Sequence, residues 1–144
     1  MANIIPFAFR GELFTGTHNF ASGGDSFKLA LYTAQPYTTS STVYSATSEV
    51  SSSSPYIGYT TTGKTLGSNA VVSTGAVATC DFSDAVWTPA TFTAAYGAIY
   101  NDTSSTDKLC VVLDFSGSKT CTNGTFTISF PSATTPADAI ISMA

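Results

Sequence analysis

Residues 108–115 read Lys-Leu-Cys-Val-Val-Leu-Asp-Phe, and this stretch decides the fold class. Its large apolar residues recur with a period of two, which places every second side chain on the same face of a β-strand. The alternation predicts a strand whose buried face carries Leu109, Val111, Leu113 and Phe115.

Two further stretches alternate in the same way. Residues 26–33 place Phe27, Leu29 and Leu31 on one face, and residues 125–131 do so with Phe126, Ile128 and Phe130. Weaker strand patterns occur at residues 69–74, 76–82, 95–100 and 137–143. No segment keeps apolar residues at helical spacing for three turns, and residues 12–16 allow one helical turn at most.

Turn-forming residues separate these strands. Residues 101–107 are a polar connection, and residues 116–119 and the Asn-Gly pair within residues 122–124 are typical of turns. Trp87 stands just before Thr-Pro, so we expect a strand to end there, with the indole at a buried corner of the core. The chain is therefore predicted to be all-β. We expect one β-sandwich domain over residues 1–144, jelly-roll or immunoglobulin-like, with seven or eight short strands.

Residues 36–65, called here the excursion loop, differ from the rest of the chain. They are rich in Ser, Thr and Tyr and have too few apolar residues for a core strand. We expect a long loop over the sandwich, anchored by Tyr44, Tyr56 and Tyr59. Long loops in compact domains are often functional, so this loop is the first place to look for a partner. The alternative is a poorly ordered surface loop.

The amino-acid composition limits the classes of function that fit this chain. Only 10% of the 144 residues are charged, against about 25% in an average domain. The net charge is −4 and the five basic residues are scattered, which argues against direct nucleic-acid binding. No apolar run reaches the roughly 18 residues of a membrane span, and the N-terminus lacks a signal-peptide pattern. We expect a protein made in a cytoplasm, with no membrane partner.

The sequence predicts no catalytic residues, no cofactor and no metal site. His18 is the single histidine, lacks a nucleophile motif, and is interpreted as a polar turn residue. Asn101, Asp102 and Asp107 could hold a weak calcium ion, but a solvated hairpin tip explains them better. Three cysteines without metal-ligand spacing are expected to be free thiols. The alternatives are an internal disulfide, for which Cys110 and Cys121 are the favoured pair, and an intermolecular link.

Tyrosine is unusually common. Packing at the sandwich edge, contact with another protein and contact with a glycan would each use such rings. The candidate partner residues all lie in the excursion loop, and they are Tyr37, Tyr44, Tyr56 and Tyr59.

The order of several segments resembles a family of small virion structural proteins of tailed bacteriophages. The segments that carry the likeness are residues 27–33, 49–51, 58–59, 86–101, 113–119 and 124–131. The resemblance covers the chain from about Phe9 to its end, although no single motif is diagnostic.

This resemblance implies a non-enzymatic β-sandwich that coats or joins parts of the particle. We expect a capsid decoration or cement protein that binds the major capsid protein or other virion proteins in many copies. Such proteins commonly sit where three capsomers meet, so by analogy a homotrimer is the preferred oligomer. The alternative is a receptor- or glycan-binding module on a tail or fibre.

Overall fold

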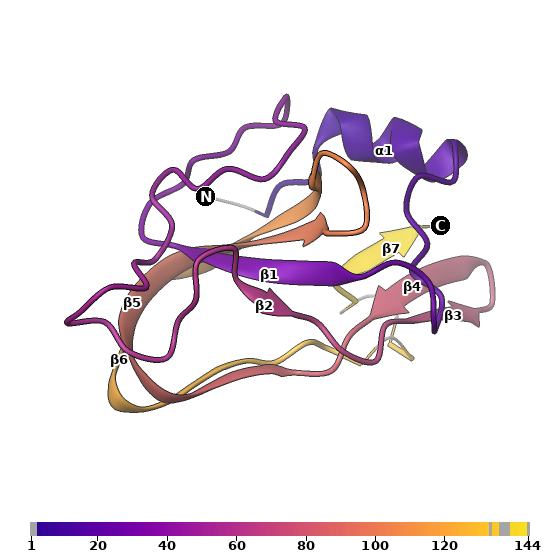
Figure 1. Ribbon diagram of the computed structural model, residues 1–144. Helices are drawn as coiled ribbons and strands as arrows, with labels where there is room; N and C mark the ends of the chain where they lie inside the picture. The colour runs from indigo at the N-terminus through magenta and orange to yellow at the C-terminus, as the bar shows by residue number, and fades with distance from the viewer. Residues whose placement is uncertain (1–2, 133, 136–138, 144) are drawn as a thin grey trace.

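The computed structural model describes residues 3–132, 134–135 and 139–143, and it is built almost entirely from strands (Figure 1). The described elements are one helix, α1 (Phe7–Phe14), and seven strands: β1 (Phe27–Tyr32), β2 (Lys64–Thr65), β3 (Ala70–Thr74), β4 (Val77–Asp81), β5 (Ala85–Asn101), β6 (Lys108–Ile128) and β7 (Ile141–Met143).

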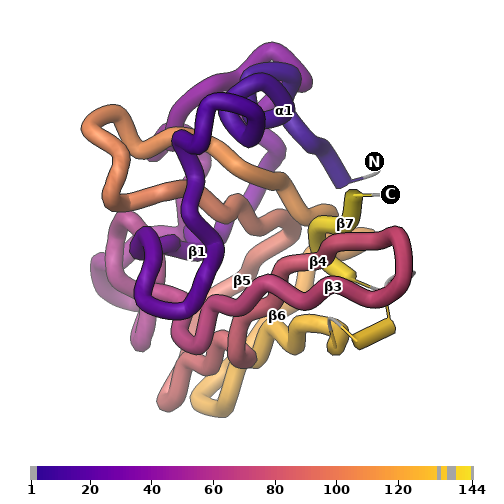
Figure 2. The backbone as a smooth tube through the Cα atoms, turned by 90° about the vertical axis from the view of Figure 1, so that its right-hand side faces the viewer, coloured from indigo at the N-terminus to yellow at the C-terminus, as the bar shows by residue number. Residues whose placement is uncertain are grey.

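The strands form two antiparallel sheets. The larger sheet has the order β2-β1-β5-β6, and the smaller has the order β3-β4-β7. Figure 2 shows the smaller sheet at one end of the molecule. The all-β, sandwich-like prediction is confirmed, although the two sheets do not close into a complete sandwich.

The two longest strands form a bent ribbon. β5 and β6 stay paired from Asn101↔Lys108 to Ala85↔Ile128, with several register shifts between. In Figure 1 this ribbon curves back on itself at one end of the molecule. Its half beside β1 therefore faces its other half across a core of aromatic rings, so one ribbon contributes to both layers.

The predicted turns at residues 116–119 and 122–124 are wrong, because β6 runs through both of them. The backbone conformation that turn residues favour is nevertheless present. Ser116, Gly117 and Asn123 have φ values of 55°, 111° and 50°. They lie where the register with β5 shifts, so they form bulges rather than hairpins. A bulge increases the local bend, which suits a ribbon that folds back on itself.

The expected end of a strand at Trp87 is also wrong, since β5 continues through Pro89 to Asn101. Pro89 falls in the register shift between Trp87 and Ala90, where its missing N–H removes no ladder hydrogen bond. The burial of Trp87 is confirmed, with 4% of its surface exposed.

One residue of the 108–115 stretch faces the other way from its prediction. Tyr100 pairs with Leu109 and Ile99 pairs with Val111, which leaves Cys110 as an extra residue in a bulge. A one-residue slip reverses the side-chain alternation. Leu109 therefore packs on the opposite face of the sheet from Val111 and Leu113.

Both faces of the larger sheet are covered. Alternate residues of β1 show this, because Leu29 and Leu31 point into the space between the layers while Ala30 and Tyr32 point outward. We call the buried residues between the layers the inner core; its aromatic members include Phe27, Phe82, Trp87, Phe92 and Phe126. We call the buried residues on the other face the outer cluster, which comprises Ala30, Tyr32, Tyr37, Ala98, Tyr100, Leu109 and Val112.

Candidate functional site

The excursion loop approaches the sheet too closely for side chains at two glycines. Gly58 and Gly63 have φ values of 86° and 81°, a conformation that L-residues rarely adopt. A Cβ atom on Gly58 would meet the carbonyl oxygen of Pro89, and one on Gly63 would meet that of Leu29. Ile57 and Thr91 also exchange two backbone hydrogen bonds, of 3.1 and 3.0 Å. The end of the loop is therefore fixed against β5 and β1.

A single carboxylate holds the middle of the loop. Glu49 Oε1 accepts hydrogen bonds from the Tyr59 hydroxyl at 2.6 Å and from the Thr62 N–H at 2.8 Å. Its Oε2 accepts one from the Tyr44 hydroxyl at 2.5 Å. The Tyr59 oxygen in turn accepts the Leu31 N–H at 3.0 Å, which links this network to β1. Burial, followed by the bond to Glu49, raises the pKa of Tyr59 and of Tyr44.

A second tyrosine pair fixes the start of the loop. The hydroxyls of Tyr32 and Tyr37 lie 2.7 Å apart, and both reach the backbone of Ser45. Nearby, the Tyr44 ring lies 4.8 Å from the Tyr100 ring, centroid to centroid. Burial is the main cause that raises the pKa of Tyr32, Tyr37 and Tyr100. The loop is therefore a hydrogen-bonded cover over the outer cluster.

The structure separates the four candidate tyrosines into two groups. Tyr37 and Tyr59 are buried within the chain and Tyr44 is partly buried, so these three act as anchors. Tyr56 is 44% exposed and can reach a partner. The sequence analysis did not identify Ile57, which is 51% exposed next to Tyr56. It also did not identify Glu49, which hydrogen-bonds to the anchors Tyr44 and Tyr59. A single glutamate in a Ser/Thr-rich segment belongs to no sequence pattern that would predict its role as the hydrogen-bond acceptor for these tyrosines.

A second polar network contains His18, which is buried rather than placed in a solvated turn as expected. Asn101 Oδ1 accepts the N–H groups of Thr103 and Ser104, so its amide nitrogen faces His18 Nδ1 at 3.1 Å. Nδ1 must therefore accept this hydrogen bond. The ring proton then sits on Nε2, which donates to Glu12 Oε2 at 2.9 Å.

The remaining contacts close this network. Asn101 also donates to Asp25 at 2.8 Å, and Glu12 binds Lys108 Nζ at 2.6 Å. Burial opposes ionisation of Glu12, but the bonds to Lys108 and His18 outweigh it and lower the pKa. Asn101 is thus an internal partner, not part of a solvated hairpin tip. The network joins α1, the segment after it and the β5–β6 turn.

The cysteines are free thiols. Cys110 is next to the His18 network, with its sulfur 3.8 Å from Nδ1, but it is fully buried and burial raises its pKa. Burial, then the charge of Asp81, raises the pKa of Cys80 to about 12. Cys121 pairs opposite Phe92, far along β6 from Cys110, which excludes the alternative disulfide. A buried protonated thiol is a poor nucleophile.

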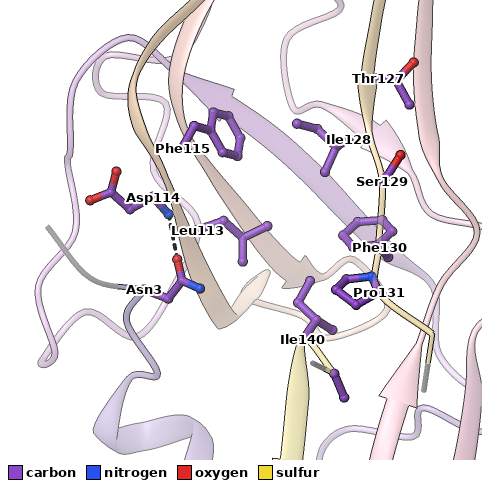
Figure 3. A pocket seen from close by; sticks show the side chains of 11 residues that line it. Asn3, Leu113, Asp114, Phe115, Thr127, Ile128, Ser129, Phe130, Pro131 and Ile140 are labelled. Atoms are coloured by element: carbon purple, nitrogen blue, oxygen red, sulfur yellow. Dashed lines mark hydrogen bonds between the residues drawn. The ribbon is translucent and has the colours of Figure 1, made fainter. Parts of the chain in front are cut away.

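A cavity of about 330 Å³ lies beside β6 (Figure 3). Leu113 and Phe115 line one side, and Ile128, Phe130 and Ile140 line the other. Asn3 Oδ1 accepts the Asp114 N–H at 2.9 Å at its margin. Polar and apolar atoms contribute similar shares of the lining, which differs from the predominantly apolar lining of a typical small-molecule site, so we assign it no ligand.

The described part of the chain gives two more negative findings. It contains no group of three His, Cys, Asp or Glu side chains that could hold a metal ion. It also contains no helix long and apolar enough to cross a membrane.

The described residues thus define an all-β protein with two sheets, whose most distinctive surface is a loop held rigidly by tyrosines and one carboxylate. No protein-family model matches the chain, and neither the curated proteins nor the solved structures include a match.

Proposed function

We propose that the protein is a non-enzymatic structural component of a tailed-phage particle, and that it decorates the capsid shell in many copies. The observation that carries the proposal is the excursion loop, which presents Tyr56 and Ile57 to solvent while Glu49 holds the middle of the loop through hydrogen bonds. Apolar and tyrosine side chains on a preorganised loop lose little entropy on binding. The resemblance to phage virion proteins gives the partner class.

The chemistry of the interior supports a role without catalysis. Glu12 contacts His18, and His18 contacts Cys110, so these side chains are arranged as a base and a nucleophile could be. The side chains of His18 and Cys110 are, however, fully buried and have no contact with solvent. Their hydrogen bonds link elements of the fold to each other. A decoration protein needs only modest affinity per copy, because attachment through many copies amplifies it.

The test is to mix the purified protein with undecorated phage heads at low and high salt and to measure co-sedimentation. We expect binding at both, since salt weakens mainly contacts between exposed charges. The double variant Tyr56→Ser, Ile57→Ser should bind at least about tenfold more weakly, a loss of about 1.4 kcal/mol. The matched control Phe14→Ser removes an apolar ring that is 87% exposed on α1, and it should bind as the wild type does.

Two results would count against the proposal. Absence of binding to heads at either salt, with binding to tails or to bacterial surface glycan, would establish the receptor-binding alternative. Unchanged binding by the double variant would show that Tyr56 and Ile57 do not form the contact.

A further inference from the structure

We infer that the protein pairs with a second copy of itself through strand β3, edge to edge and antiparallel. β3 is the end strand of the smaller sheet and pairs with β4 on one side only, among the residues that the structure describes. In an antiparallel ladder, alternate residues turn their N–H and C=O groups away from the partner strand. The open side of β3 therefore presents unpaired backbone groups to solvent.

The other edges of the two sheets are short, covered in part, or interrupted. β2 has two residues and one of them is Lys64, while β7 has three residues. The edge of β6 is covered at Val112 by Ile4, through hydrogen bonds of 2.9 and 2.8 Å. It is covered again at Lys108 by a bridge to Val43 of the excursion loop. Beyond Val112 the edge of β6 is interrupted by register shifts and carries the charged residues Asp114 and Lys119. Short strands, lysine and covering segments are the usual protection against edge pairing.

β3 has none of these protections. It has five residues, its register with β4 runs without a shift, and it contains no proline. No charged residue occurs anywhere in residues 65–80, so two copies meet there without charge repulsion. Its residues are Ala-Val-Val-Ser-Thr, and three of these five are β-branched, a composition that favours strand pairing.

The strand is also complementary to itself. A two-fold axis through Val72 places Val72 opposite its copy, Val71 opposite Ser73, and Ala70 opposite Thr74. Each pair combines small or β-branched uncharged side chains, which are acceptable cross-strand neighbours. This isologous arrangement is the commonest symmetry of homo-oligomers. It extends the order β7-β4-β3 into one continuous six-stranded sheet.

The face of β3 supplies a second observation. Val71 is 53% exposed and borders a hollow of about 160 Å³, lined almost wholly by apolar atoms, with Leu13, Phe20 and Met143 among its walls. Pairing two copies of β3 places Ser73 of the second copy directly beside Val71 on the same face of the sheet. The backbone edge and an exposed apolar side chain thus meet in one surface.

The surface is separate from the proposed shell contact. Figures 1 and 2 place the β3–β4 hairpin at one end of the molecule, and Figure 1 places the tip of the excursion loop at the other. One copy can therefore use both surfaces at once. Five-residue edge pairing buries less area than a standard interface, so we expect a weak dimer with a dissociation constant on the order of 100 µM.

The test is sedimentation velocity of the full chain from about 5 to about 500 µM, a range that brackets this dissociation constant. We expect the wild type to shift from monomer toward dimer. Ser73→Lys should stay monomeric, because the pairing brings the two substituted positions to diagonal sites whose backbones lie about 7–8 Å apart, so the two introduced positive charges repel each other. The matched control Ser53→Lys adds the same charge on an exposed residue of the excursion loop and should dimerise as the wild type does.

A monomer at every concentration, a trimer, or a Ser73→Lys protein that dimerises normally would each overturn the inference. Amide exchange of the wild type gives a second readout that needs no variant. The amides of Val71 and Ser73 should exchange more slowly at high protein concentration, whereas unchanged exchange would contradict edge pairing. Neither measurement uses phage heads, so failure here is distinct from failure of the proposed function.

Discussion

The two faces of the β1–β5–β6 sheet are filled by different chemistry. The inner core is built from aromatic rings in direct contact, such as Phe92 against Phe126 with centroids 4.9 Å apart. On the other face, the excursion loop and the outer cluster are joined by tyrosine hydroxyls that bind one another, Glu49 and the backbone. The stability of the inner core depends on how well the rings fit together. The stability of the loop and outer cluster depends on the protonation of the tyrosine hydroxyls and on hydrogen-bond partners that are distant in sequence.

Alkaline pH should act mainly on the tyrosine hydroxyls of the loop and outer cluster, and it reaches the inner core through Tyr59, Cys80 and Cys110. The folded-state pKa values of Tyr32, Tyr37, Tyr59 and Tyr100 are raised, mainly by burial. Their stabilisation is therefore complete below the unfolded value near pH 10 and is lost as pH rises above it. Each group then costs up to about 1.4 kcal/mol per pH unit, so we expect cooperative unfolding near pH 11.

Urea unfolding at a series of pH values, with tyrosinate absorbance recorded in parallel, checks this. The unfolding free energy should fall as pH rises from 10 to 11. Ionisation of these tyrosines without loss of stability would contradict the burial of their hydroxyls.

The substitution Trp87→Ala tests the packing of the inner core. The indole contacts the rings of Tyr59, Phe92 and Phe126, and 4% of its surface is exposed. We expect a loss of about 3–5 kcal/mol in the free energy of unfolding, the usual cost of removing a large buried aromatic side chain. Urea denaturation measures it, with the exposed Phe14→Ala as control. A loss below about 1 kcal/mol would show that the ring does not support the core.

The substitution Glu49→Gln tests the hydrogen-bond acceptor at the centre of the excursion loop. A neutral amide replaces the charged acceptor of three hydrogen bonds, and its NH₂ group faces donors. Because bonds to charged groups contribute about 1.5–3 kcal/mol, we expect a loss of about 2 kcal/mol. The control is Asp102→Asn, which removes a more exposed ion pair with Lys28 and should cost less than about 1 kcal/mol. Equal losses in the two variants would argue against a special role for Glu49.

Tyr56→Ser should have the smallest effect on stability. Its ring is 44% exposed, so the change should stay within about 0.5 kcal/mol in thermal or urea unfolding. Together with weaker co-sedimentation, this result would separate a binding residue from the anchors. A loss as large as that of Glu49→Gln would instead make Tyr56 a fourth anchor.

The sequence predicted the inner core better than the outer one, for a physical reason. Alternation of period two identified Phe27, Leu29, Leu31 and Phe126, because packing between layers requires large apolar side chains at every second position. The same rule failed at Leu109, since no local pattern reveals a bulge at Cys110.

The turn signals were correct about backbone conformation and wrong about topology. Asn123 adopts the left-handed conformation that Asn-Gly favours, but a neighbouring strand continues past it, so the chain bulges instead of turning. The candidate site was predicted only in part. The position of the loop and two of its expected anchors, Tyr44 and Tyr59, followed from the sequence. The third, Tyr56, is exposed instead, and Tyr37 is an anchor that was not expected. The separation of Tyr56 from Tyr37 and Tyr59 depends on contacts with β1 and Glu49, which lie outside any local pattern.

The bent β5–β6 ribbon also determines how this molecule can come apart. Since the same two strands line both layers, neither layer has a hydrophobic core of its own. A fluctuation that separates β1 from β5 exposes aromatic rings of the inner core that also pack against the opposite layer. Partial opening is then nearly as costly as complete unfolding, so proteases and aggregation-prone contacts gain little access to the core strands through local motion.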